Sequence, residues 1–307
     1  MRRGNAPEGY SRAGVWAGES GQMLDFLARR FPRVDVAVWR ARIARGEVLD
    51  AQGRPVRCDT RVEGLSHVFY RRTPEQEAPI PFEAQVLYQD AHLVVADKPH
   101  FLPTAPGGQY VEQTLLTRLQ RQLRLPRLAP LHRLDKDTAG LVLLSPEPAG
   151  RDAWHTLFRS RAVRKLYEAV APWRAGLEQP RTHASRMEEG GARFFTMHEV
   201  PGAPNSQTHI EMAARSGAWA LYRLRPVTGK KHQLRLHMAA LGAPIRHDAF
   251  YPEINDPPPG DYSRPLQLLA RELAFTDPVS GCERVFVSQQ RLQWPVEAEN
   301  PPYADEQ

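Results

Sequence analysis

The sequence has little cysteine and no long apolar run, and each shortage excludes a class of protein. Its two cysteines, Cys58 and Cys282, lie far apart and form no CxxC pattern. This excludes a disulfide framework and a zinc site built on cysteines, and it is typical of the reducing cytoplasm. No apolar run approaches the ~18 residues that cross a membrane. Residues 1–16 lack the apolar core of a signal peptide. We therefore expect a cytoplasmic protein with no membrane attachment.

What the chain does have is positive charge, concentrated in two blocks. It holds 41 basic residues, of which 5 are lysines, against 35 acidic residues, for a net charge of +6. Residues 1–75 hold 14 basic and 9 acidic residues, and residues 115–165 hold 11 and 4. Arginine makes forked contacts with phosphates and stacks on bases, so this pattern favours a nucleic-acid partner. A solvated basic helix face together with a basic N-terminal segment explains the same charge without a partner.

Length and turn signals divide the chain into two globular parts. A chain of 307 residues corresponds to about two domains at roughly 100–200 residues each. We predict a flexible leader over 1–20, a module of two helices and a hairpin over 21–73, and a proline-containing linker over 74–82. A larger domain follows over 83–296, and residues 297–307 form a polar tail.

The larger domain mixes strand and helix signals without a regular βαβ order, which favours the α+β class. Gly242 is placed to end the last predicted helix. The pattern predicts a hairpin over 86–95, strands over 141–144, 166–171 and 220–224, and helices over 112–124 and 232–241.

A cluster of charged residues stands directly before the strand at 141–144. It comprises His132, Arg133, Asp135, Lys136 and Asp137. Charged side chains at the mouth of a buried strand need partners, and a salt-bridge knot that stiffens the loop would explain them. A carboxylate such as that of Asp135 can instead supply covalent catalysis. The residues alone leave both explanations open.

Motifs along residues 80–285 resemble those of the RluA-type pseudouridine synthases. HRLDKDTAG at 132–140 is similar to that family's HRLD signature, and Asp97-Lys98-Pro99 is similar to its lysine–proline turn. Its remaining motifs are similar, in the same order, to Arg164–Tyr167, Pro226–Arg235, Gly242–Asp248 and Leu269–Pro278. The resemblance implies a pseudouridine synthase catalytic domain of the α+β class, with a mixed, mainly antiparallel central sheet flanked by helices.

The resemblance also implies a chemistry. The family breaks the N1–C1′ bond of a uridine, turns the uracil and rejoins it through C5, without a cofactor or a metal. It implies that Asp135 is the nucleophile, Arg235 its ion-pair partner and Tyr167 the residue against the target base. Residues that would contact the RNA are His132, Arg133, Lys165, Lys230, Lys231, His232 and Gln233. Since His132, His232 and His237 show no HxxxH or HExxH spacing, we expect no metal site.

The N-terminal module resembles an S4 RNA-binding domain in part. Its Val48–Gly53 segment lacks the usual asparagine before the glycine, so the module is a degenerate match. An S4-like module accompanies family members that modify large-subunit rRNA, which leads us to expect a monomeric enzyme acting on rRNA, with tRNA as the alternative. Lys230, His247 and Leu269 depart from the family's usual Arg, Gly and His, and these departures bear on the choice of substrate.

Two functions from other classes compete with this interpretation. A non-catalytic RNA-binding or assembly protein that retains the fold would bind structured RNA with a steep salt dependence. The Asp–Tyr–Arg set argues against it. An aspartate-dependent hydrolase of small molecules would leave the two basic blocks unexplained.

Overall fold

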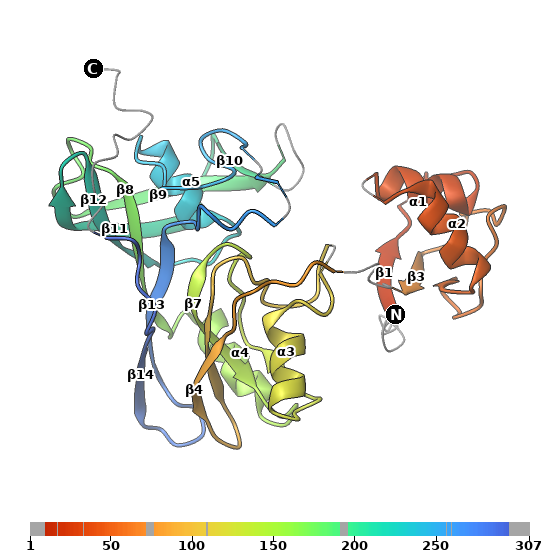
Figure 1. The fold of residues 1–307 in the computed structure, drawn as a ribbon, viewed down its shortest axis with the longest axis horizontal. Helices are drawn as coiled ribbons and strands as arrows, with labels where there is room; N and C mark the ends of the chain where they lie inside the picture. Colours follow the sequence, from red (N-terminus) through yellow and green to blue (C-terminus); the bar gives the residue numbers. More distant parts are fainter. Residues whose placement is uncertain are drawn as a thin grey trace. The chain divides into compact units, whose positions relative to one another are not determined.

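The chain folds into two compact units, each with its own hydrophobic core. The computed structural model describes residues 10–294 apart from 17, 33, 72–76, 109, 191–195, 256 and 259. The units are Met1–Glu75 and Gln76–Gln307 (Figure 1). Their boundary falls within the segment 74–82 for which the sequence predicts a linker.

The first unit combines two helices with a small antiparallel sheet. Met23, Phe26 and Leu27 occupy one face of the first helix and are buried with Trp39 of the second, as their i, i+3, i+4 spacing predicts. The helices are α1 (Met23–Arg30) and α2 (Val36–Ala44), and the strands pair in the order β1 (Tyr10–Gly14), β3 (His67–Arg71), β2 (Val48–Leu49).

One prediction for this unit needs correction. The sequence predicts a flexible leader over 1–20, yet residues 10–14 form β1 and pair along their whole length with β3. The predicted hairpin is confirmed, since Leu49 pairs antiparallel with Pro55 and the N–H of Val56 donates to the carbonyl of Val48. The strand before the turn, β2, also pairs with β3. Both pairings with β3 join residues that are distant in the sequence, so local patterns do not reveal them.

The second unit is built on a mixed sheet, which has 11 strands in the described residues. The main path runs β10-β9-β11-β12-β8-β13-β7-β5-β4, while β14 pairs with β13 and β6 with β7 (Figure 1). The pairing of β13 with β7 is parallel and the other pairings are antiparallel. This confirms the predicted α+β architecture with a mixed, mainly antiparallel sheet. The strands are β4 (Gln85–Gln89), β5 (Val94–Lys98), β6 (Ala129–Pro130), β7 (Ala139–Ser145), β8 (Arg164–Pro172), β9 (Arg181–Glu189), β10 (Met197–Val200), β11 (Ser206–Ser216), β12 (Trp219–Pro226), β13 (Leu268–Thr276) and β14 (Glu283–Val287).

Helices cover both faces of the sheet, because alternate residues of the central strands point to opposite sides. Val142 and Leu144 of β7 share a core with α3 (Leu115–Gln122), whereas Leu141 and Leu143 share a different core with Trp154 of α4 (Arg151–Arg159). The third helix, α5 (Gln233–Ala240), packs on β8, β11 and β12. Across the described ranges, every helix is too short or too polar to cross a membrane.

Residues 77–82, the described part of the predicted linker, are fixed to the second unit. The Glu77 carboxylate accepts hydrogen bonds from the N–H groups of Val111 and Gln113, just before α3. The guanidinium of Arg118, on α3, donates to the carbonyls of Ile80 and Phe82. These residues therefore belong to the folded domain, which corrects the predicted linker at its C-terminal end.

Candidate active site

The charged cluster lies in a loop between β6 and β7 that is anchored on its backbone at several points. Thr104 Oγ1 donates to the carbonyl of Leu134 at 2.9 Å and accepts from the N–H of the same residue at 3.1 Å. The His100 ring bonds the carbonyl of Asp137 at 2.8 Å. The N–H of Thr138 donates to the carbonyl of Asp135. The main chain on both sides of the predicted nucleophile is therefore fixed.

Lys98 is a further anchor of this loop that the sequence analysis left without a role. Its side chain is fully buried. Its ammonium donates to the carbonyls of Pro99 at 3.0 Å, Leu102 at 2.7 Å and Lys136 at 3.0 Å. Burial lowers the pKa of Lys98 to about 7, and the carboxylates of Asp137 and Asp135 oppose that shift. Lys136 directly follows Asp135, so Lys98 ties the end of β5 to the residue next to the predicted nucleophile. The signal in the sequence was a lysine that follows an apolar strand in a lysine-poor chain.

Arg235 lies on α5 and links two carboxylates. Its Nη1 is 3.5 Å from Asp135 Oδ2, while its Nε and Nη2 donate to Asp248 at 2.7 and 2.6 Å. Arg235 is 1% exposed and Asp248 is 0% exposed, whereas Asp135 is 29% exposed. The structure thus brings Asp135 and Arg235 together as predicted and adds Asp248, which the sequence analysis did not place in the site.

The environment of Arg235 keeps it charged. Burial alone would lower the pKa of Arg235, but the Asp248 carboxylate and its hydrogen bonds outweigh burial and raise it. The guanidinium carbon also lies over the ring of Phe250, 4.8 Å from the ring centre, and 5.7 Å from that of Tyr251. The cation is therefore held from one side by a forked ion pair and packed against aromatic faces, which leaves Nη1 directed at Asp135.

The start of α5 is fixed by Gln233. Its Oε1 accepts from Thr228 Oγ1 and from the N–H of Lys230, and its Nε2 donates to the carbonyl of Gln207 and to Thr208 Oγ1. His232, just before it, has φ of 54° and turns the chain into the helix. Since this network sets where α5 begins, it also sets the position of Arg235 on its first turn.

Tyr167 lies on β8, where it pairs with Leu224 of β12 and Ala270 of β13. Its ring is partly buried and packs against two of the hydrophobic cores. Burial, followed by the charge of Asp135, raises the pKa of Tyr167 above its usual value. The phenol is therefore neutral at physiological pH and interacts electrostatically with Asp135.

The predicted RNA-contact residues divide into surface and internal positions. Arg133, Lys230 and Lys231 are exposed. Lys165 is half-buried, and burial together with Arg161 lowers its pKa.

The side chains of the other three predicted RNA-contact residues, His132, His232 and Gln233, make contacts inside the protein, whereas the prediction has them contact RNA. His132 stacks on Phe158 and its Nε2 accepts a hydrogen bond from the N–H of Leu143, while burial lowers the pKa of His132 to about 3. His232 is 8% exposed. Its Nδ1 is 3.1 Å from the hydroxyl of Tyr251, and its Nε2 is 4.0 Å from Asp135. Gln233 is buried, with the bonds described above. These side chains shape the site from within.

One group of side chains has the composition of a metal site. Within the described ranges, His183, Glu199 and His237 place one ligand atom each within 4.8 Å of one another. His183 Nε2 already bonds the Glu199 carboxylate at 2.8 Å, and the His237 ring nitrogens lie 2.9 and 3.0 Å from the hydroxyls of Ser206 and Thr208. The ring contacts thus form a hydrogen-bond network that joins α5 to β9, β10 and β11.

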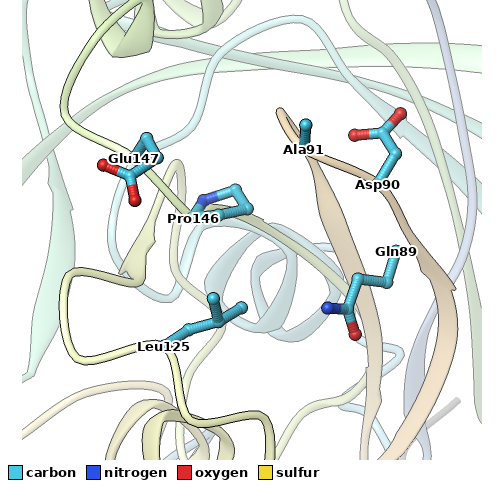
Figure 2. Close-up of a pocket in the computed structure, with 6 residues that line it drawn as sticks. All are labelled: Gln89, Asp90, Ala91, Leu125, Pro146 and Glu147. Atoms are coloured by element: carbon cyan, nitrogen blue, oxygen red, sulfur yellow. The ribbon is translucent and has the colours of Figure 1, made fainter.

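A surface hollow lies apart from these residues. Figure 2 shows its lining, which consists of Gln89, Asp90, Ala91, Leu125, Pro146 and Glu147. It adjoins the turn between β4 and β5, next to the end of β7, whereas Asp135 precedes the start of β7. The Asp90 carboxylate already accepts hydrogen bonds from the N–H groups of His92 and Leu93. The hollow and the predicted nucleophile therefore lie at opposite ends of β7.

Comparison with known proteins connects this geometry to a family. The family model described as RNA pseudouridylate synthase matches residues 92–240, a span that contains Asp135, Tyr167 and Arg235. An uncharacterized RNA pseudouridine synthase of Synechocystis sp. is 31% identical over 233 residues, which cover 75% of this chain and 79% of the relative. The dual-specificity RNA pseudouridine synthase RluA of Haemophilus influenzae is 32% identical over 223 residues, which cover 67% of this chain and 93% of that protein.

A solved structure agrees with these relatives. The human protein named RNA Pseudouridylate Synthase Domain Containing 4 matches with a TM-score of 0.54 and 26% identity, covering 67% of this chain and 88% of that chain. About two thirds of this chain thus shares its fold with a protein whose name includes RNA pseudouridylate synthase. The chain therefore belongs to the RluA-type family of RNA pseudouridine synthases and is an isomerase that modifies RNA.

Proposed function

We propose that Asp135 is the nucleophile with which this enzyme isomerises specific uridines of structured RNA, and that its main substrate is large-subunit rRNA. The observation that carries the proposal is that the partly exposed carboxylate of Asp135 lies 3.5 Å from the buried guanidinium of Arg235. A positioned cation fixes the direction of a carboxylate, which a nucleophile requires.

The reaction that we propose balances without a cofactor. The carboxylate of Asp135 bonds to C1′ as the N1–C1′ bond breaks, the detached uracil turns, and the Asp135–C1′ bond breaks as the C5–C1′ bond forms. The proton lost from C5 is matched by the proton gained at N1, so the product is an isomer of the substrate. We propose that the phenol of Tyr167 stacks against the uracil and takes part in proton transfer, a role that its electrostatic interaction with Asp135 supports.

The surface charge supports binding of an RNA backbone. Arg133, Lys230 and Lys231 are exposed on the segments that carry the Asp135 loop and the start of α5. The first unit adds Arg40, which is exposed on α2. We propose that the first unit acts as a degenerate S4-like RNA-binding module. Phosphate contacts of this kind weaken as salt increases, so the affinity for RNA should fall steeply with ionic strength.

The test is chemical mapping of pseudouridine in rRNA and tRNA transcripts treated with the purified enzyme. We expect new pseudouridine at a defined position with the wild type and none with Asp135→Asn, which keeps the size of the side chain but removes its charge. RNA binding by Asp135→Asn should persist. Full activity in Asp135→Asn would overturn its role as nucleophile.

The choice of RNA needs its own measurement. The Haemophilus influenzae relative is named a dual-specificity enzyme. Both rRNA and tRNA should therefore be assayed, with tRNA as the alternative substrate. Mapping the pseudouridine that disappears from total RNA of a deletion strain identifies the natural target. Conversion of tRNA alone would contradict the rRNA proposal while leaving the reaction unchanged. Sedimentation of the purified protein tests our expectation of a monomer.

A further inference from the structure

Phe101 adopts a backbone conformation that bulky residues rarely adopt. Its φ is 66°, in the left-handed region, which costs a non-glycine residue roughly 1–2 kcal/mol. It follows Lys98, Pro99 and His100, and the turn wraps around the Lys98 ammonium, which binds the carbonyls of Pro99 and Leu102. A glycine would satisfy this turn without strain, so the aromatic ring at position 101 calls for a reason of its own.

The ring of Phe101 belongs to a set of three aromatic side chains, which we call the aromatic platform. It consists of Phe82, Phe101 and Tyr262, whose ring centres are 5.1 to 5.8 Å apart. Phe82 and Phe101 are stacked, and Tyr262 meets Phe82 edge-on. Phe101 is 8% exposed, while Phe82 and Tyr262 are half-buried. Phe82 and Tyr262 are therefore partly open to a ligand, and the buried ring of Phe101 packs against both of them.

The platform is connected to the loop and the core that carry the predicted catalytic residues. His100, next to Phe101, bonds the carbonyl of Asp137 in the loop of Asp135. Phe82 packs against the same hydrophobic core as Tyr167 and Leu134, the residue before Asp135. The platform and the predicted site thus share one core.

Exposed charges of both signs flank the platform, and the acidic residues Glu83 and Asp261 directly adjoin Phe82 and Tyr262 in the chain. Lys136, the residue after Asp135, is exposed, and so is Arg264, two residues after Tyr262. Cationic side chains beside a partly open aromatic surface are the usual features of a site for single-stranded RNA, in which bases stack on rings while cations meet phosphates.

We propose that the aromatic platform stacks a nucleobase adjacent to the target uridine in the RNA substrate. The proposal rests on the proposed function, because a uridine turned out of its stack leaves a neighbouring base without its partner. A ring surface beside the site replaces that lost stacking. Stacking is tolerant of sequence, so the platform would add affinity and register rather than read a particular base.

The experiment compares Tyr262→Leu with Tyr262→Phe. Leucine keeps apolar bulk in the cluster but removes the flat ring, whereas phenylalanine keeps the ring. The probe is a short oligouridine carrying one 2-aminopurine, whose fluorescence falls when the base stacks. We expect quenching by the wild type and by Tyr262→Phe, and little by Tyr262→Leu. The Kd for the probe should rise about tenfold in Tyr262→Leu, within the range measured for one base–aromatic stack.

The outcomes separate this proposal from the proposed function. If Tyr262→Leu quenches and binds like the wild type but unfolds at a lower temperature, the rings only pack the domain and the proposal is overturned. If Tyr262→Leu fails to fold, Phe82→Leu provides the same comparison from the other open ring. Asp135→Asn should keep the quenching and lose all isomerisation. Quenching by a wild type that converts no uridine of rRNA or tRNA would refute the proposed function and leave the stacking site intact.

Discussion

Replacing Asp248 by asparagine tests whether Asp248 positions Arg235. The side chain keeps its size and one carbonyl oxygen, but it loses its charge and gains an NH₂ group that faces the guanidinium. Arg235, 1% exposed, then remains buried with Asp135 as its remaining carboxylate contact, at 3.5 Å. We expect Arg235 to shift towards Asp135, which changes the direction of the proposed nucleophile. Isomerisation should therefore slow while RNA binding persists.

The magnitude follows from the burial of the pair. Removing one partner of a buried ion pair costs about 3–5 kcal/mol, because the other charge is left uncompensated. A loss of this size is a large part of a typical unfolding free energy of about 5–15 kcal/mol. At about 2–4 °C per kcal/mol for a domain of this length, the melting temperature should fall by about 6–20 °C. The expected loss of turnover is at least about tenfold, since small displacements of a catalytic group cost up to about 100-fold.

A double-mutant cycle provides the decisive assay. Thermal unfolding is measured for the wild type, Asp248→Asn, Arg235→Met and the double variant. Because the double variant removes both charges, it should be less destabilised than the two single losses added together, with a coupling of about 2–3 kcal/mol. Additive losses, or a single variant that loses less than about 1 kcal/mol, would refute the argument that the pair is buried and tightly held.

Three further predictions concern the support of the loop and of β7. Lys98→Met deprives the carbonyls of Pro99, Leu102 and Lys136 of their common donor. We expect a loss of about 3 kcal/mol or more in urea unfolding and a lower kcat/KM. Burial lowers the pKa of His132 from 6.5 to about 3. Between these two pH values the folded state therefore binds fewer protons than the unfolded state. Stability should then fall as pH drops through that window, and His132→Phe should flatten this slope. Gly140→Ala, with φ of 112°, would place Cβ 2.7 Å from the backbone nitrogen of Ala270, and should lower the melting temperature by separating β7 from β13.

Gly140→Ala has a matched control, and each of the other two predictions has a result that would contradict it. Gly150→Ala shares a positive φ but has no atom within 4 Å of the added Cβ, so it should cost about 1–2 kcal/mol, less than Gly140→Ala. Equal losses at the two glycines would contradict the close approach of β7 and β13. For His132, an unchanged acid slope in His132→Phe would mean that its imidazole titrates normally. For Lys98, unaltered stability in Lys98→Met would mean that the three carbonyls find other donors.

Much of the catalytic unit could be predicted because its signals are local. The apolar stretch at 141–144 lies in β7, and the spacing at 232–241 predicts α5, which spans Gln233–Ala240 and is followed by Gly242 with φ of 72°. Both elements follow from side-chain periodicity and a turn residue, which need no knowledge of distant neighbours. The order of the motifs around Asp135, Tyr167 and Arg235 likewise indicated a common site.

The partners of these residues could not be predicted, since they depend on tertiary contacts. Asp248 and Asp135 are both acidic residues near turns, yet Asp248 is 0% exposed and forks onto Arg235. Gln233 looks like a surface amide on a polar helix start, but its amide bonds β11 and the preceding turn. In both cases the deciding fact is which element packs over the side chain, and a sequence pattern does not contain it.

The site combines two separate supports for Asp135. Thr104, His100 and Lys98 bond backbone atoms of residues 134, 137 and 136, so they fix the path of the loop and leave the carboxylate itself free to rotate. The direction of the carboxylate depends instead on Arg235, which Asp248 holds. Weakening the first support should move the loop together with its neighbouring cations and thus affect RNA binding and turnover together. Weakening the second should affect turnover alone, so the split between KM and kcat distinguishes the two.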